Sequence, residues 1–314
     1  MSTAAPADVT ARIEQLVVYP VKSCAGTALP AAVLTPTGLE FDRAWMLVDQ
    51  RSEFVSQREL PRMALVAPQL RHADMVLRAP GMLALHVALE QVEQAVQVKL
   101  WGEQMPAYDM GDLCAQWFSD FLLAGPQAQA QAARAGISRL RLVRFDPDYR
   151  RLSDKKWTGG QEAENQFSDG FPVLVISQAS LAECNARLQA AGHASVDMAR
   201  FRPNIVLSGL AAHEEDQLDV LRPAGPAEGS GAAGAESAQP LALRMVKPCP
   251  RCPIPNIDPQ TALSSPEVGD LLQSYRTNPL QGGAVCFGMN AIVQSGDGQV
   301  LQVGQVLAAG YRFE

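Results

Sequence analysis

Residues 247–259 (Lys-Pro-Cys-Pro-Arg-Cys-Pro-Ile-Pro-Asn-Ile-Asp-Pro) constrain the fold more than any other stretch, because they combine two thiols and two cations with five prolines. Each proline fixes its own φ near about −65° and pushes the preceding residue toward extended geometry. Cys249 and Cys252 are therefore expected on a stiff backbone that is not helical. Such a backbone presents a thiol in one fixed direction, so we take this segment as the candidate chemical centre.

The composition indicates a large globular protein that is not built for nucleic acid or membranes. Its 314 residues, 47% of them hydrophobic, suffice for one large domain or two closely packed ones. The net charge of −7 is spread along the chain, which argues against nucleic acid or an anionic membrane as the main partner. No stretch approaches the roughly 20 apolar residues of a membrane helix, and the first residues lack the apolar run of a secretory signal. We therefore expect a cytosolic location.

The first part of the chain predicts an N-terminal β-barrel-like domain over residues 1–123. Short β-type runs separated by turn signals occur at residues 13–19, 44–48, 75–77, 83–87 and 96–101. Residues 112–123 have apolar side chains at helical spacing, which predicts an amphipathic helix at the end of this domain.

Residues 124–314 predict a second domain. The Gln- and Ala-rich residues 125–136 are helix-permissive but have little to bury, which predicts a solvated connector rather than a functional element. Strands are expected at residues 140–145, 171–176, 205–207 and 241–247, a helix at 266–275, and a closing β pair of 285–293 with 301–307. Residues 223–240 are rich in Ala, Gly, Pro and Ser and predict a disordered insertion. The fold class is therefore α+β and rich in β-structure.

The thiols of Cys249 and Cys252 allow four interpretations. A structural zinc site usually takes four Cys or His ligands, and the sequence has neither a second CxxC nor a spaced His pair. A thioredoxin-type dithiol would place its first Cys at a helix N-terminus, which Pro253 and Pro255 disfavour. The two thiols can also be small buried side chains, or one thiolate can ligate a soft metal that arrives inside a larger cofactor. The six cysteines are too scattered for a disulfide framework, so we expect reduced thiols.

Cations and small donors stand next to several predicted strands, as an anionic cofactor would require. They are Lys22 with Ser23, Arg43, Arg202 with Asn204, and Arg251 beside the thiol. Arg is the favoured residue for bidentate phosphate recognition, and Lys adds a point charge.

Six motifs carry a resemblance to a known family. They are Tyr19-Pro-Val-Lys-Ser-Cys-Ala-Gly26, Gly38-Leu-Glu-Phe-Asp-Arg-Ala-Trp-Met-Leu-Val48, residues 169–180, Arg200-Phe-Arg-Pro-Asn-Ile205, Cys249-Pro-Arg-Cys252 with Asp258-Pro-Gln-Thr261, and Phe287-Gly-Met-Asn290. In this order and spacing they resemble the MOSC family, and within it the branch of the mitochondrial amidoxime-reducing component and related bacterial enzymes. The resemblance covers nearly the whole chain.

The resemblance implies an N-terminal β-barrel domain packed against a MOSC domain that is mostly β-barrel with peripheral helices. It also implies a molybdenum cofactor, molybdopterin with molybdenum, whose metal is ligated by Cys252, with Cys249 as a dispensable neighbour. The pterin and its phosphate would be held by Lys22, Ser23, Arg43, Arg202, Asn204 and Arg251. Asp169 falls where the family often has a carboxylate near the metal, which makes it a candidate for proton handling or, alternatively, a strand-end cap.

Three departures from the family pattern concern the pocket. Pro250 stands where the family often has a hydroxyl residue, Pro253-Ile254-Pro255-Asn256 stands where it often has a run of β-branched residues, and Ala262 stands where it usually has Gly. The expected ligand and cations are retained, so these departures bear on the shape of the substrate pocket more than on cofactor binding.

The implied activity is the reduction of small N-hydroxylated substrates such as amidoximes and hydroxylamines. A separate iron–sulfur or flavin protein must supply the electrons, because the cysteines form no four-Cys cluster pattern. The basic residues 150–156, otherwise a solvated loop, are one hypothetical docking site. Two alternatives remain: a non-catalytic sulfur-carrier or cofactor-binding MOSC module, and a zinc-stabilised interaction protein.

Overall fold

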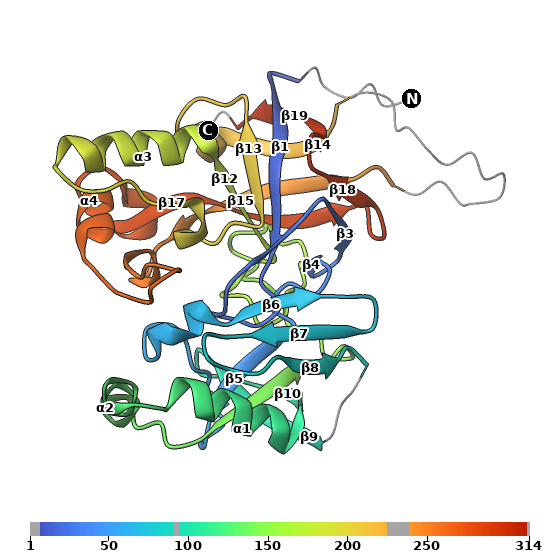
Figure 1. Cartoon of the computed structure of the whole chain (residues 1–314). Coiled ribbons are helices and arrows are strands. Elements are labelled where there is room, and N and C mark those ends of the chain that lie inside the picture. Colours follow the sequence, from blue (N-terminus) through green and yellow to red (C-terminus); the bar gives the residue numbers. More distant parts are fainter. Residues whose placement is uncertain (1–6, 91–93, 225–238, 313–314) are drawn as a thin grey trace.

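The computed structural model describes residues 7–90, 94–224 and 239–312 and shows two lobes, one above the other in Figure 1. The upper lobe contains the strands of the C-terminal half together with the N-terminal strand. The lower lobe contains most of the strands between residues 45 and 145. Most of the disordered insertion predicted at residues 223–240 lies outside the described residues.

A closed barrel of seven strands forms the upper lobe, because β12 pairs with both β13 and β17. The order around the barrel is β12 (Val173–Ser177), β13 (Ile205–Ser208), β1 (Val9–Val18), β19 (Val306–Tyr311), β14 (Leu218–Pro223), β15 (Ala242–Pro250) and β17 (Ala284–Ser295). All neighbours are antiparallel except β12 and β13. The short strands β2 (Thr27–Leu29) and β16 (Thr277–Asn278) extend this sheet.

The apolar run of β12 explains how the barrel is covered on both faces. Val173 and Val175 belong to the core inside the barrel, whereas Leu174 and Ile176 pack with the helices on its outer face. Successive side chains of a strand point to opposite faces, so both faces of this strand are apolar. Gly288 on β17 has φ +79, and a Cβ there would lie 2.5 Å from the Ile176 side chain, so the close approach of β17 to β12 requires glycine.

The lower lobe is built on two antiparallel sheets. One has the order β5 (Trp45–Asp49), β11 (Leu140–Phe145), β10 (Glu103–Asp109) and β9 (Gln94–Leu100), and the other has β6 (Ala67–Leu70), β7 (Asp74–Arg78) and β8 (Leu85–Ala88). A further sheet of β18 (Val300–Gln302), β3 (Ala31–Thr35) and β4 (Gly38–Leu39) belongs to the upper lobe. The protein is therefore β-rich with two barrel-like parts, as the sequence predicts.

Each of the two domains predicted from the sequence, residues 1–123 and 124–314, contributes a strand to a sheet of the other. Strand β1 pairs with β13 and β19 in the upper barrel, and β11 pairs with β5 in the lower lobe. The domain boundary between residues 123 and 124 stays a prediction. The chain passes from one lobe to the other both before and after this boundary.

Four α-helices occur in the described residues. They are α1 (Gly111–Leu122) and α2 (Pro126–Ala135) in the lower lobe, and α3 (Gln178–Ala190) and α4 (Glu267–Tyr275) against the barrel. In the part of the chain that the structure describes, none of them is long and apolar enough to cross a membrane.

One expectation about secondary structure, the closing β pair, is wrong. The helix-permissive residues 126–135 form α2, in which Ala128 and Ala132 are the buried residues and Gly136 ends the helix in the left-handed conformation. Residues 285–293 and 301–307 do not close the fold as a pair. Strand β17 pairs with β12, β15 and β16, β18 pairs with β3, and β19 pairs with β1 and β14.

Candidate functional site

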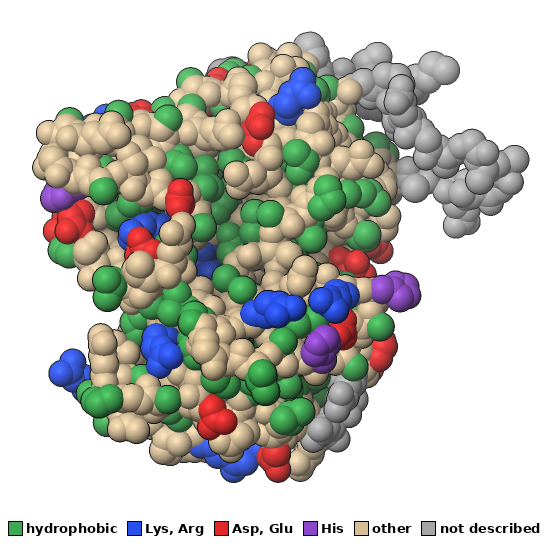
Figure 2. Space-filling view, in the orientation of Figure 1, with side chains coloured by type: hydrophobic (Ala, Val, Ile, Leu, Met, Phe, Trp, Pro, Cys, Tyr) green, Lys and Arg blue, Asp and Glu red, His purple; other side chains and the backbone are tan. Residues whose placement is uncertain are grey.

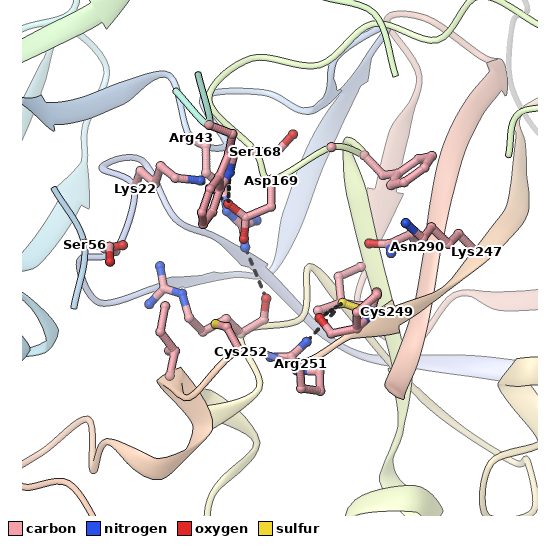
Figure 3. A pocket seen from close by; sticks show the side chains of 18 of the residues that line it. Lys22, Arg43, Ser56, Ser168, Asp169, Lys247, Cys249, Arg251, Cys252 and Asn290 are labelled. Carbon is pink, nitrogen blue, oxygen red and sulfur yellow. Dashed lines mark hydrogen bonds and ion pairs between the residues drawn. The ribbon is translucent and has the colours of Figure 1, made fainter. Parts of the chain in front are cut away.

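A cavity of about 590 Å³ lies between the lobes, and it brings together all eight residues predicted for the site. They are Cys252, Asp169, Lys22, Ser23, Arg43, Arg202, Asn204 and Arg251. Figure 3 labels Lys22, Arg43, Asp169, Arg251 and Cys252 among them and shows these side chains converging from segments far apart in the sequence. Their individual roles stay predictions.

The cavity is strongly cationic although the protein is acidic overall. Its wall has seven Lys or Arg residues against two Asp residues, whereas the net charge of the chain is −7. Figure 2 shows Lys and Arg side chains along the waist between the lobes. Such a wall attracts and holds an anionic ligand.

Lys22 and Asp169 form an ion pair at this cavity. Lys22 follows β1 and is nearly buried, and its Nζ donates to Asp169 Oδ1 at 2.5 Å and to the Phe167 carbonyl at 2.8 Å. Trp101 Nε1 also donates to Asp169 Oδ1, at 3.2 Å. Burial lowers the pKa of Lys22, and Asp169 opposes that effect. Burial would raise the pKa of Asp169, but the Lys22 ammonium holds it well below its usual range.

Two guanidinium groups stack on the ring of Tyr19. Arg43 and Arg202 place their central carbons 4.3 and 4.2 Å from the ring centroid. Arg43 Nη1 donates to buried Asp42 at 2.5 Å, and this partner raises the pKa of Arg43 although burial lowers it. Within the described residues Arg202 has no such carboxylate, so burial and the charge of Arg43 lower its pKa to about 10, against the opposing influence of Tyr19. Arg202 also adopts a left-handed φ of 59.

Asn204 positions this cationic pair. Its Oδ1 accepts from Arg43 Nη1 at 3.0 Å and from the Leu174 amide at 3.1 Å, and its Nδ2 donates to the Val17 carbonyl at 3.1 Å. The side-chain amide of Asn204 is buried, and both its oxygen and its nitrogen already bond to groups of the protein. Asn204 therefore acts chiefly by orienting Arg43.

The thiol segment leaves the barrel at the end of β15. This strand runs to Pro250, so Cys249 is still in the sheet, while Arg251 and Cys252 follow it. Arg251 Nη1 donates to Cys249 Sγ at 3.2 Å, and its Nη2 donates to the Phe201 carbonyl at 2.8 Å. Cys252 is partly exposed on the cavity wall.

Two buried guanidinium nitrogens at this wall indicate what the cavity binds. Within the described residues, Arg202 Nη2 and Arg251 Nε have no hydrogen-bond partner. Buried donors of this kind normally have an acceptor, because leaving them unpaired costs on the order of 1–3 kcal/mol or more. An anion rich in oxygen would satisfy both donors, and the thiol of Cys252 lies beside them. The residues present therefore fit an anionic cofactor whose metal takes one thiolate.

The other interpretations of the thiols find less support. Among the residues that the structure describes, no three His, Cys, Asp or Glu side chains gather as a metal site, which disfavours structural zinc. Cys249 and Cys252 are free thiols. Cys249 lies in a strand, so it lacks the helix N-terminus of a thioredoxin-type dithiol.

Several lining residues were not predicted from the sequence. Arg58 stacks at 4.6 Å on the ring of Trp101, and both line the cavity. Ser56-Gln57-Arg58 is a polar island like that at residues 22–24, and this was the available signal. Lys247, Ser168 and Asn290 complete the polar wall.

The basic residues 150–156 behave differently from one another. Arg151 is buried and donates to the carbonyls of Gln166 and Ser168, so it supports the segment that carries Asp169. Arg150 forms ion pairs with Glu162 and Glu164, and Lys155 forms one with Glu162. These pairs place carboxylates beside two of the basic side chains, and the docking role of residues 150–156 stays a prediction.

Comparison with known proteins identifies the family. Residues 10–124 match the MOSC N-terminal beta barrel domain, and residues 162–308 match the MOSC domain. Mitochondrial amidoxime reducing component 2 of Rattus norvegicus is 32% identical over 275 residues, which cover 84% of this chain and 72% of the relative. Mitochondrial amidoxime-reducing component 1 of Homo sapiens is 29% identical over 297 residues, 90% of this chain and 79% of the relative.

A third relative matches in one section only. Molybdenum cofactor sulfurase of Bos taurus is 27% identical over 288 residues, which cover 86% of this chain but 29% of the sulfurase. With matches to both domains and relatives of this identity over most of its length, the chain belongs to the MOSC family, as the motifs in its sequence indicate.

Proposed function

We propose that this protein is an oxidoreductase that binds a molybdenum cofactor between its lobes and reduces N-hydroxylated compounds such as amidoximes and hydroxylamines. The observation that carries the proposal is the pair of buried, unpartnered guanidinium nitrogens of Arg202 and Arg251 at the cavity wall that also presents Cys252. The relatives named as amidoxime-reducing components support the reaction class, and the one named molybdenum cofactor sulfurase supports the cofactor.

The chain offers distinct groups for each part of such a cofactor. Cys252 would supply a thiolate to the metal, a soft ligand of the kind that molybdenum accepts. Arg43, Arg202 and Ser23 would hold the phosphate and pterin, and Arg251 would add a donor beside the thiol. Once bound, the cofactor would supply two-electron redox chemistry.

The ion pair of Lys22 and Asp169 is the proposed source of protons. Conversion of an amidoxime to an amidine and water consumes two electrons and two protons. Because Lys22 holds the pKa of Asp169 well below its usual range, the carboxyl is ionised at neutral pH and has no proton to give. The proton is carried by Lys22 Nζ, whose pKa burial lowers toward a more acidic value. Asp169 orients Lys22, and after transfer its negative charge favours return of a proton from solvent to the amine, so that Lys22 can supply the second proton.

Electrons come from a separate iron–sulfur or flavin protein in this proposal. The six cysteines of the chain form no four-Cys cluster pattern, so an internal iron–sulfur relay has no ligands in the sequence. The cytosolic location stays a prediction, since two of the relatives are named mitochondrial.

A sulfur-carrier or cofactor-carrier module is the second candidate. It is favoured by the likeness to one section of a molybdenum cofactor sulfurase and by the guanidinium that contacts Cys249 Sγ. A carrier would hold sulfur or cofactor without reducing an N–O bond.

One set of proteins tests both candidates. Wild type, Cys252→Ser and Cys249→Ser are purified from a molybdenum-replete host, and bound molybdenum, pterin and zinc are measured together with benzamidoxime reduction by a reduced viologen dye. We expect molybdenum and activity in the wild type and in Cys249→Ser, and loss of both in Cys252→Ser. Zinc without molybdenum or pterin in the wild type would refute the proposal. Cofactor without N–O reduction would favour the carrier, and equal metal loss in both variants would indicate a two-thiolate site.

A further inference from the structure

The cavity has a second cationic end that the proposed cofactor site does not use. Figure 3 shows Lys247, Asn290 and Cys249 on one side and Lys22, Arg43 and Ser56 on the other, with Asp169 and Cys252 between them. Lys247 on β15 and Asn290 on β17 are register partners in the antiparallel pair. Side chains of directly opposed residues on one face of a sheet lie within contact distance of one another. The ammonium and the amide are therefore placed to bind one group together.

Lys247 differs from Lys22 and Arg43 in how its charge is balanced. Lys22 is paired with Asp169 and Arg43 with Asp42. In the described part of the chain, Lys247 has no carboxylate within ion-pair distance; instead its Nζ lies 5.0 Å from the ring of Trp157 and 5.8 Å from that of Phe171.

Aromatic rings hold an ammonium in place without cancelling its charge. Their attraction for a cation arises from the ring quadrupole, which carries no net charge. Lys247 is thus directed by Trp157 and Phe171 and still presents a full positive charge to whatever enters. Asn290 adds an amide that makes no hydrogen bond within the described residues other than through its backbone, and Phe171 also lines the cavity.

We infer that the substrates preferred by this protein carry a carboxylate remote from the N-hydroxyl group, and that Lys247 and Asn290 bind this carboxylate. The inference rests on the proposed reductase function and specifies its substrate class. Phe171 contributes an apolar face for the body of the substrate, while the N–O group is directed toward Cys252 and Asp169. A neutral substrate lacks the charge partner, and a cationic one is repelled.

Two matched compounds test the assignment: 4-carboxybenzamidoxime and its neutral 4-carbamoyl isostere. Their kcat/KM values are measured with the cofactor-loaded protein and a reduced viologen dye, and the preference is the ratio of the two. We expect the wild type to prefer the carboxylate by about tenfold, which corresponds to about 1.4 kcal/mol. We expect the preference to fall with added NaCl because the charges are partly exposed.

Variants of two lysines beside the same ring locate the effect. Lys247→Met should abolish the preference and raise KM for the carboxylate, whereas Lys247→Arg should keep most of it. Lys156 lies 5.4 Å from the same Trp157 ring but does not line the cavity, so Lys156→Met should keep the wild-type preference.

The possible outcomes distinguish a failure of this inference from a failure of the proposed reductase function. Reduction of both compounds without a carboxylate preference, or a preference that survives Lys247→Met, overturns the inference and leaves the reductase function standing. Loss of molybdenum and pterin in Lys247→Met also overturns it, because Lys247 would then serve the cofactor. Failure of the loaded wild type to reduce either compound rejects the reductase function itself.

Discussion

Replacing Arg202 by methionine should stabilise the cofactor-free protein while it weakens cofactor retention. Arg202 and Arg43 stack on one tyrosine ring, and in the part of the chain that the structure describes Arg43 has a carboxylate partner whereas Arg202 has none. Burial and the neighbouring cation lower the pKa of Arg202 to about 10 from its ordinary value of 12.5. A lowered pKa for a cation means that its charged form is less favourable in the folded chain than in the unfolded chain.

The magnitude follows from that shift. Neutral pH lies below both pKa values, so the whole difference acts as destabilisation, about 3 kcal/mol at about 1.4 kcal/mol per pKa unit. Methionine removes this cost, but it also removes the 2.6 Å hydrogen bond from Arg202 Nη1 to the Cys24 carbonyl and the contact with Tyr19. These are worth about 1 kcal/mol each. We expect a net gain on the order of 1 kcal/mol.

Arg43→Met is the matched control and should have the opposite sign. It leaves the carboxylate of Asp42, whose side chain is 1% exposed, without its cation, and breaking a buried pair in this way costs about 3–5 kcal/mol. Urea unfolding of the cofactor-free proteins, with pterin content measured separately, checks both variants. Both should retain less cofactor. A loss of stability in Arg202→Met comparable to that in Arg43→Met would refute the argument that Arg202 is held against its own electrostatics for a ligand.

Three further predictions concern the ion pair, the barrel and the support of Asp169. Asp169→Asn removes the negative charge that opposes the effect of burial on Lys22, so the pKa of Lys22 should fall further. The alkaline limb of the pH profile of kcat/KM should then move to lower pH, and a limb that does not move would contradict Lys22 as the proton source. Gly288→Ala should lower the free energy of unfolding by about 3 kcal/mol or more, measured by thermal unfolding. Gly298→Ala, where the added Cβ would meet open space, should lower it by about 1 kcal/mol. Arg151→Met should cost about 2 kcal/mol and speed proteolysis within residues 150–170, because buried acceptors lose their donor.

The site was predictable from sequence to the extent that its residues stand beside strong strands. Lys22, Arg43 and Arg202 each adjoin an apolar run, and polar residues at the ends of buried strands are readily recognised. Arg58 and Trp101 come from the lower lobe and reach the cavity through the packing of the two lobes. Arg58 stands in the polar run 56–58, which was a local signal, whereas the packing that brings Trp101 to the cavity leaves none in the sequence.

The pairing of strands was less predictable than their existence. Residues 285–293 and 301–307 are neighbours in sequence, which favours a hairpin, yet their partners are as distant as β1 and β3. Closure of the barrel decides these pairings, since β17 also completes the ring against β12. Residues 126–135 were recognised only as helix-permissive, because a helix with a face of alanines buries too little to show a clear apolar stripe.

The prolines of the thiol segment explain why its two cysteines are unequal. Pro248 and Pro250 lack the N–H that a ladder needs, and the register of β15 against β17 shifts between them. Cys249, which lies between these prolines, stays in the sheet and packs against the apolar cluster under α3 and α4. The Arg251 amide makes one more bond to the Val285 carbonyl, after which the chain leaves the sheet. Cys252 is the first thiol beyond that point, so it faces the cavity without a place in the ladder and remains free to serve as a ligand.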